Sequence, residues 1–254
     1  SGDDRHVICF GTETTIADSS TQDNMFLRWS GQDDQNVWTP TATNTAGSKR
    51  LVDGNVIQTA VRSRGAVLIW TDTALYQMQF IGPPLTFGFN QLGSACGCIG
   101  LHAAVDVGGV SFWMGTDSFF LFDGAVQKIP CTVQDYVFDD LNQNAKQDIF
   151  CAANTDFNEV MWFYPSLNST QIDRMVVFNY AENLWYVGTL ARSAWADRGT
   201  YDNPYAAEFE ASDTTATIST ITGLKAGRTF IYLHESGSND DGSTMSAHIE
   251  SGDV

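Results

Sequence analysis

Short stretches of alternating apolar and polar residues run along most of the chain, and turns rich in glycine and aspartate separate them. Between Ala74 and Phe80, for example, Tyr76, Met78 and Phe80 alternate with two glutamines. This two-residue period is that of a half-buried β-strand. Three strands joined by tight turns are therefore predicted in this region, at 57–62, 66–70 and 74–80.

The same arrangement of strands and turns repeats along the sequence. Units are predicted near 57–80, 103–127, 149–188 and 228–250. The turn pair Thr71-Asp72 recurs as Thr116-Asp117, about 45 positions later, and Gly65 recurs as Gly109. A period of roughly 40–50 residues with three or four strands per repeat is typical of four-stranded propeller blades. The sequence thus predicts an all-β fold over 1–254, a propeller-like array of three- to four-stranded antiparallel blades. A β-sandwich, whose strands also recur at short spacing, is the competing interpretation.

One short helix is predicted around 132–141, between the second and third units. The Thr132 side chain can cap the first turn. The side chain of Asp135, three residues later, can accept a hydrogen bond from the Thr132 backbone amide, as in a capping box. The face expected to be apolar carries Val133, Tyr136, Val137 and Leu141. The segment 203–224 is rich in Thr, Ser and Ala and interrupts the repeat, so it is predicted to be a loop or small insertion. Four blades or fewer seldom close a ring, and we therefore expect the chain to be a fragment of a longer polypeptide.

The chain is strongly acidic, with 13 basic and 30 acidic residues and a net charge of −17. Nucleic-acid binders need clustered Lys and Arg to displace counterions from phosphates. Such clusters are missing here, and neither Lys nor Arg occurs between Ala66 and Gln127. The acidity fits plain solubility or a surface that must not adhere to DNA or anionic membranes. Neither a long apolar run nor a signal-peptide pattern is visible, so a soluble protein is predicted.

The cysteines form an odd and scattered set: Cys9, Cys96, Cys98, Cys131 and Cys151. Cys96-Gly97-Cys98 is the one close pair, and neither a second pair nor a nearby histidine pair completes a zinc site. We therefore expect free structural thiols, with no zinc and no disulfide, and assembly in a reducing cytoplasm.

Residue types with catalytic potential are dispersed along the chain. The phosphate-binding, dinucleotide-binding and nucleophile-elbow motifs are missing. The four histidines are far apart, at His6, His102, His234 and His248. Propeller glycosidases use paired carboxylates, for which the candidates are Asp33, Asp34, Asp72, Asp117, Asp139, Asp140, Asp156, Glu159, Asp173 and Asp197. Asp72, Asp117 and Asp156 fall in predicted hairpin turns, where an aspartate caps its own backbone. The pairs Asp173-Arg174 and Asp197-Arg198 are interpreted as local ion pairs. The sequence predicts no enzyme and no catalytic, cofactor-binding or metal-binding residues.

Two segments have an alternative interpretation as binding sites. Glu235–Gly242 has the composition of a calcium loop, but EF-hand spacing would need Asp at 237 and Glu at 248, where Gly237 and His248 stand. A solvated hairpin tip is therefore expected. The aromatic residues at 162–164 and 185–186 could stack on sugars, but packing in a strand core is the favoured explanation.

A series of short motifs stands in a characteristic order between about Arg5 and Gly199. The series is Arg28-Trp29-Ser30, Asn36–Gly47, Thr71–Tyr76, Phe80–Pro84, Phe122-Asp123-Gly124, Asn158–Tyr164 and Leu184–Leu190. In this order the motifs resemble those of tail nozzle or tail accessory structural proteins of short-tailed bacteriophages, which are podovirus virion proteins. The resemblance weakens after about Thr200.

The resemblance implies a structural role built around a propeller-like domain. In such tails several copies form a ring or nozzle below the portal and adaptor, and the genome is ejected through its channel. The implied partners are other copies of the chain, the adaptor and other tail proteins, while DNA passes without specific binding. The implied location is the virion tail, after assembly in the host bacterial cytoplasm. A receptor- or carbohydrate-binding β-propeller and a propeller glycosidase remain the alternatives.

Overall fold

The computed structural model describes residues 5–210, 228–237, 239–240 and 243–244. Strands make up 47% of the structure and helices 9%, which confirms the predicted β-rich class. The chain divides into two compact units, Ser1–Ser193 and Ala194–Val254. Within the described residues, no helix is long and apolar enough to cross a bilayer.

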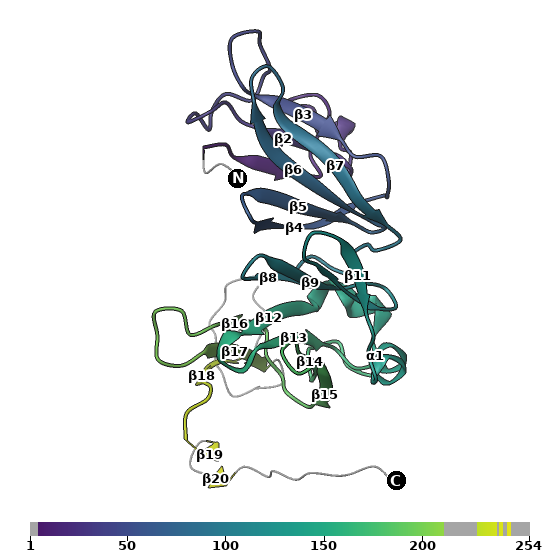
Figure 1. Ribbon diagram of the computed structural model, residues 1–254, viewed down its shortest axis with the longest axis vertical. Coiled ribbons are helices and arrows are strands. Elements are labelled where there is room, and N and C mark those ends of the chain that lie inside the picture. Colours follow the sequence, from purple (N-terminus) through teal and green to yellow (C-terminus); the bar gives the residue numbers. More distant parts are fainter. Residues whose placement is uncertain (1–4, 211–227, 238, 241–242, 245–254) are drawn as a thin grey trace, which may run out of the picture. The chain divides into compact units, whose positions relative to one another are not determined.

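The first unit contains four antiparallel sheets that follow one another along the chain (Figure 1). The first sheet comprises β1 (Ile8–Phe10), β2 (Phe26–Trp29) and β3 (Gly47–Arg50). The second comprises β4 (Ile57–Ser63), β5 (Ala66–Thr71), β6 (Ala74–Gly82) and β7 (Thr86–Ser94). The third comprises β8 (Ala104–Val107), β9 (Val110–Met114), β10 (Phe119–Phe122) and β11 (Val126–Ile129). The fourth comprises β12 (Phe150–Asn154), β13 (Glu159–Tyr164), β14 (Arg174–Asn179) and β15 (Leu184–Gly188). In every sheet each strand pairs with the next strand in sequence, so all four are simple meanders.

The sheets pack face to face through two apolar clusters. The strand β5 shows how: all six of its residues are buried, because neighbouring side chains point to opposite faces and both faces are covered. Val67 and Ile69 belong to the cluster shared with the first sheet. Leu68 and Trp70 belong to the larger cluster, which continues into the third and fourth sheets. The second sheet is therefore an inner layer of the unit.

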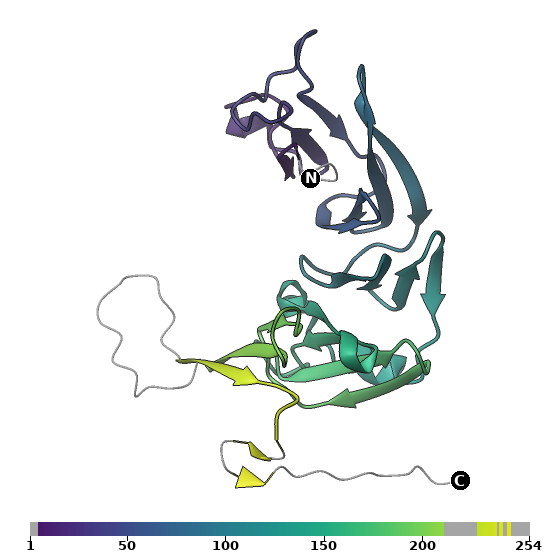
Figure 2. The same cartoon turned by 60° about the vertical axis from the view of Figure 1, so that its left-hand side comes forward.

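The first strands of three successive sheets lie next to one another. The strand β8 contacts both β4 and β12, while the later strands of each sheet extend away from this row (Figure 2). Neighbouring sheets thus meet along the strands with which they begin.

The predicted helix is present but shorter, as α1 (Gln134–Asp140), followed by the 3-10 turn η2 (Gln143–Asp148). The predicted capping box is wrong: the residue at the cap position is Val133, which has no side chain able to cap. Val137 and Leu141 are buried as expected, but Tyr136 is 56% exposed and does not share their face. Two further 3-10 turns are η1 (Ser19–Thr21) and η3 (Thr155–Phe157).

The second unit differs from the predicted pattern. Its sheet has the order β16-β17-β18, formed by Ala194–Ala196, Tyr205–Glu210 and Arg228–Leu233. The segment 203–224, expected to be a loop or insertion, therefore contains the strand β17, and 211–224 lie outside the described residues. The strand β18 pairs with β17 and does not open a new repeat. Beyond it, the short hairpin β19 (Asn239–Asp240) and β20 (Ser243–Thr244) is described, whereas 238, 241–242 and 245–250 of the unit expected at 228–250 lie outside the described residues.

Candidate interaction surface

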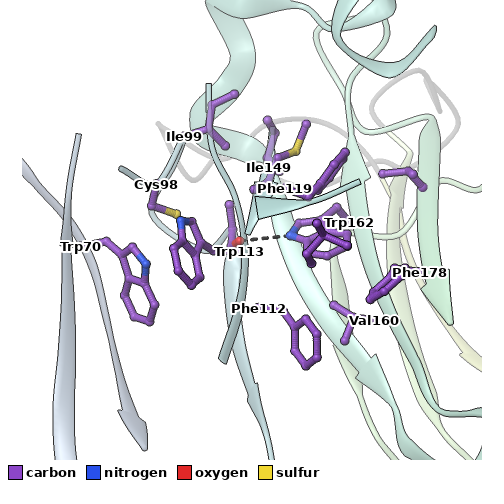
Figure 3. Packing of buried hydrophobic residues seen from close by; sticks show 14 of the residues in the cluster. Trp70, Cys98, Ile99, Phe112, Trp113, Phe119, Ile149, Val160, Trp162 and Phe178 are labelled. Carbon is purple, nitrogen blue, oxygen red and sulfur yellow. Dashed lines mark hydrogen bonds between the residues drawn. The ribbon is translucent and has the colours of Figure 1, made fainter. Parts of the chain in front are cut away.

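A tryptophan stands on the second strand of each of the first four sheets, at intervals of about 40–50 positions. These residues are Trp29, Trp70, Trp113 and Trp162. The last three are fully buried and lie in a row through the larger cluster (Figure 3). The rings of Trp70 and Trp113 meet edge to face at 5.3 Å, and Trp162 lies 4.8 Å from Phe119 of the third sheet. Each sheet thus places one large aromatic residue against its neighbour.

Two of these indoles anchor one connecting segment, 96–103, which we call the central linker. The Nε1 of Trp113 donates to the Cys96 carbonyl at 2.8 Å, and that of Trp162 donates to the Ala103 carbonyl at 3.1 Å (Figure 3 shows the second). The Nε1 of Trp70 has no hydrogen-bond partner among the described residues. The two hydrogen bonds fix both ends of the linker to the third and fourth sheets.

The backbone of the central linker is bonded to three sheets at once. The Cys96 and Cys98 amides donate to the carbonyls of Thr73 and Thr71 at the turn of the second sheet. The Ile99 amide donates to Met114 of the third sheet, and the carbonyl of His102 accepts from Cys151 of the fourth. The linker therefore joins the second, third and fourth sheets into one scaffold.

Gly97 allows this close approach. A Cβ placed on Gly97 would lie 2.2 Å from the carbonyl carbon of Asp72, closer than side chains ever approach a backbone. The Cys96-Gly97-Cys98 pattern therefore reflects a backbone crossing with a buried thiol on each side. Burial raises the pKa of the Cys98 thiol to about 12, and its Sγ donates to the Gly100 carbonyl at 3.4 Å.

Arg64 ties the outer turns of two sheets together. It lies in the β4–β5 turn, and its Nη1 donates to the carbonyl of Asp123, in the β10–β11 turn, at 3.1 Å. Its side chain also lies over Gly109, in the β8–β9 turn, where a Cβ would come within 2.6 Å of the Arg64 Nε. The repeated glycines at 65 and 109 thus have different roles, since a Cβ on Gly65 would meet open space.

The carboxylates that the sequence offered as candidates bind local structure. Asp72 accepts hydrogen bonds from the backbone and side chain of Asn55, at 2.7 and 2.9 Å, so it also fastens a neighbouring loop. Burial raises its pKa, but these bonds outweigh burial, and the pKa lies below its usual value. Asp33 pairs with Arg5. Within the described residues, no three His, Cys, Asp or Glu side chains are arranged to hold a metal ion.

One carboxylate cluster joins the helix α1 to the fourth sheet. Asp140 lies 3.4 Å from Arg174, which is 3.9 Å from Asp173, and Asp173 accepts from both the amide and the hydroxyl of Ser166 at 2.7 Å. The buried Tyr164 lies beside them, and burial followed by the charge of Asp140 raises its pKa. The pair Asp173-Arg174 is thus part of a larger ionic cluster, as the sequence predicted only in part.

The remaining candidates are dispersed. His6 lies against Thr45 and Phe87, His102 is in the central linker, and His234 packs on Trp195. His248 and part of Glu235–Gly242 lie outside the described residues. The aromatic run 162–164 is fully buried, so it is core, as the sequence favoured.

No protein-family model matches the chain, and no curated protein matches it.

The tip of the β6–β7 hairpin is a group of neighbouring exposed apolar side chains in the first unit. Its strands have nine residues each and are the longest described. From Thr73 to Val105 the sequence has no Asp, Glu, Lys or Arg, although the chain as a whole is strongly charged. At the tip, Ile81 is 54% and Leu85 is 68% exposed, and Pro83 and Pro84 are exposed between them. Apolar patches of this kind mark contact surfaces.

A groove lies beside α1, between the third and fourth sheets in sequence. It has a volume of about 450 Å³ and is lined by Cys131, Thr132, Val133, Gln134, Asp135, Tyr136 and Val187. The hairpin tip, the groove and the tryptophan row were not predicted from the sequence. The tryptophan spacing was visible in the sequence, as was the uncharged stretch, whereas the groove depends on how α1 packs.

Proposed function

We propose that this protein is a structural component of the tail of a short-tailed phage and that its meander sheets are blades of a propeller-like array. The array would form part of a ring or nozzle below the portal and adaptor. The observation that carries the proposal is the row of first strands, β4, β8 and β12, from which successive meanders extend. Blades are arranged in this way around the channel of a propeller.

The contacts between neighbouring sheets support a structural role. The tryptophan row, the central linker and Arg64 connect neighbouring sheets through buried rings and backbone hydrogen bonds. The wall of a channel through which a genome passes must keep its shape. Close-packed protein interiors resist deformation. The candidate carboxylates Asp33, Asp72, Asp140 and Asp173 hold loops or form ion pairs. These contacts favour a structural role over catalysis.

The charge supports passage of DNA without binding. A surface that does not neutralise phosphates releases no counterions and gains no affinity for DNA. With a net charge of −17, the protein repels DNA at distances within the Debye length, about 8 Å at physiological salt.

Two measurements test this function. Native mass spectrometry and electron microscopy of the purified protein, alone and with tail adaptor protein, should show rings. Fluorescence anisotropy with duplex DNA should show no binding at physiological salt. A protein that stays monomeric at all concentrations and binds neither adaptor nor tail proteins would refute the proposal.

The receptor-binding alternative retains one supporting observation, since Tyr136 and Tyr186 are exposed aromatic residues that a sugar could stack on. A glycan array would test it. Retention of a defined glycan that is lost in Tyr186→Ala would favour this alternative.

A further inference from the structure

We propose that the tip of the β6–β7 hairpin docks into the groove beside α1 of a second copy of this chain. The inference rests on the proposed function, because it names the contact by which copies would assemble into a ring. Its two halves are different surfaces of one molecule: the tip belongs to the second sheet, and the groove is lined by 131–136 and Val187.

Charge is the first reason to assign the tip to a second copy. Two copies carry −17 each, so most pairings of their surfaces bring like charges together. The hairpin lies within the uncharged stretch Thr73–Val105 and can approach an acidic protein without that repulsion. The groove has a single charged residue on its wall, Asp135, which an uncharged tip would not oppose.

The tip also leaves few backbone hydrogen-bond donors unpaired when it is buried in a contact. Pro83 and Pro84 have no amide hydrogen, so the turn presents fewer donors that would go unpaired on burial. The Phe87 amide is already bonded to the Leu85 carbonyl at 2.7 Å. Ile81 and Leu85 supply the apolar surface, and burial of such side chains is the main favourable contribution to association.

The groove, like the tip, exposes apolar side chains. Val133 and Val187 give it aliphatic walls, and Tyr136 offers an aromatic ring that is 56% exposed. Aromatic rings supply a large apolar surface against which aliphatic side chains can pack. Because tip and groove are distinct patches, the contact is head to tail, and repetition of such a contact produces a ring or an open filament.

Site-directed cross-linking tests the contact directly, because Cys131 is a native thiol in the groove. In a Cys9→Ser background, which removes an exposed thiol, Leu85→Cys should form intermolecular disulfides with Cys131 under mild oxidation. Burial raises the pKa of Cys131 to about 11, so the reaction is run near pH 9. A head-to-tail contact should give a ladder of dimers, trimers and larger species on non-reducing gels.

Two controls make the result decisive. The ladder should disappear when Cys131 is changed to Ser, and Asn90→Cys, on the same hairpin but away from the tip, should not produce it. A product that stops at dimers and survives Cys131→Ser would show a tip-to-tip contact and overturn the inference.

Sedimentation velocity provides a second test that needs no oxidation. Leu85→Glu and Tyr136→Ala should each weaken self-association at least about tenfold, while Asn90→Glu, which adds the same charge, should leave it unchanged. If self-association is unchanged in Leu85→Glu and Tyr136→Ala, the docking inference is overturned but the ring function is not. A wild-type protein that stays monomeric would overturn the docking inference, and one that also binds neither adaptor nor tail proteins would refute the ring function as well. Flotation with phosphatidylcholine vesicles that is lost in Leu85→Glu, without self-association, would assign the tip to a membrane and overturn the inference.

Discussion

The tryptophan row permits a matched comparison between a bonded and an unbonded indole. Trp113 and Trp70 are both fully buried and touch each other, yet only the Nε1 of Trp113 has an acceptor among the described residues, the carbonyl of Cys96. Changing either residue to Phe removes a similar amount of apolar surface. Trp113→Phe also leaves a buried carbonyl without its donor, which costs about 1–3 kcal/mol. Trp70→Phe instead removes a buried N–H that had no partner.

We therefore expect Trp113→Phe to be less stable than Trp70→Phe by at least about 1 kcal/mol. Urea unfolding followed by far-ultraviolet circular dichroism measures the difference, which at an m-value of about 3 kcal/mol per M is a midpoint shift of about 0.3 M or more. Trp162→Phe should cost less than Trp113→Phe, because the Ala103 carbonyl that loses the indole still accepts from the Met114 amide at 3.1 Å. Equal midpoints for Trp113→Phe and Trp70→Phe, or a lower midpoint for Trp70→Phe, would refute the role assigned to the linker hydrogen bonds.

Three further outcomes are expected. Gly97→Ala should destabilise the protein by about 1–3 kcal/mol, because its Cβ would overlap the Asp72 backbone; a neutral effect in thermal unfolding would show that the linker does not lie there. Cys98 should resist iodoacetamide at pH 8 and react after denaturation, since its pKa of about 12 leaves almost no thiolate; rapid labelling of Cys98 in native protein, seen by peptide mass spectrometry, would contradict its burial. Asp72→Asn should lower stability at pH 7 by less than about 1 kcal/mol, because much of the carboxylate is screened by solvent. The folded pKa of Asp72 is lowered, so its stabilisation is full above the unfolded value near 3.9 and is lost as pH falls through the folded value; a deficit that persists unchanged at pH 2 would contradict this origin.

The sequence predicted the strands that alternate clearly and missed those that do not. The strand β6 shows the two-residue period, and β5 shows a short apolar run bounded by turn residues, so both were found. The strand β7 contains two glycines and four polar residues, and its pairing with β6 depends on the hairpin as a whole. The first sheet was missed because β1 has three residues and long connections separate its strands.

Side-chain roles were harder to predict than strands. An aspartate in a turn was expected to cap its own backbone, and the sequence did not predict that Asp72 also binds Asn55, 17 positions earlier, because the loop before β4 passes beside this turn. The prediction of the helix cap was wrong for a similar reason: α1 begins after Val133, and Thr132 lies before the cap position. Both depend on packing between segments, which the local sequence does not encode.

The meander order of the sheets affects how the chain folds during synthesis. Within each sheet of the first unit, every strand pairs with the next strand along the chain, so each sheet can form from a short local segment and the pairing requires little loop closure. The inner second sheet, however, has two apolar faces, and the partner for one of them is synthesised before it while the partner for the other comes after it. From the completion of β7 until the third sheet emerges, Leu68 and Trp70 have no covering layer, which makes this the interval in which the nascent chain is most prone to aggregation.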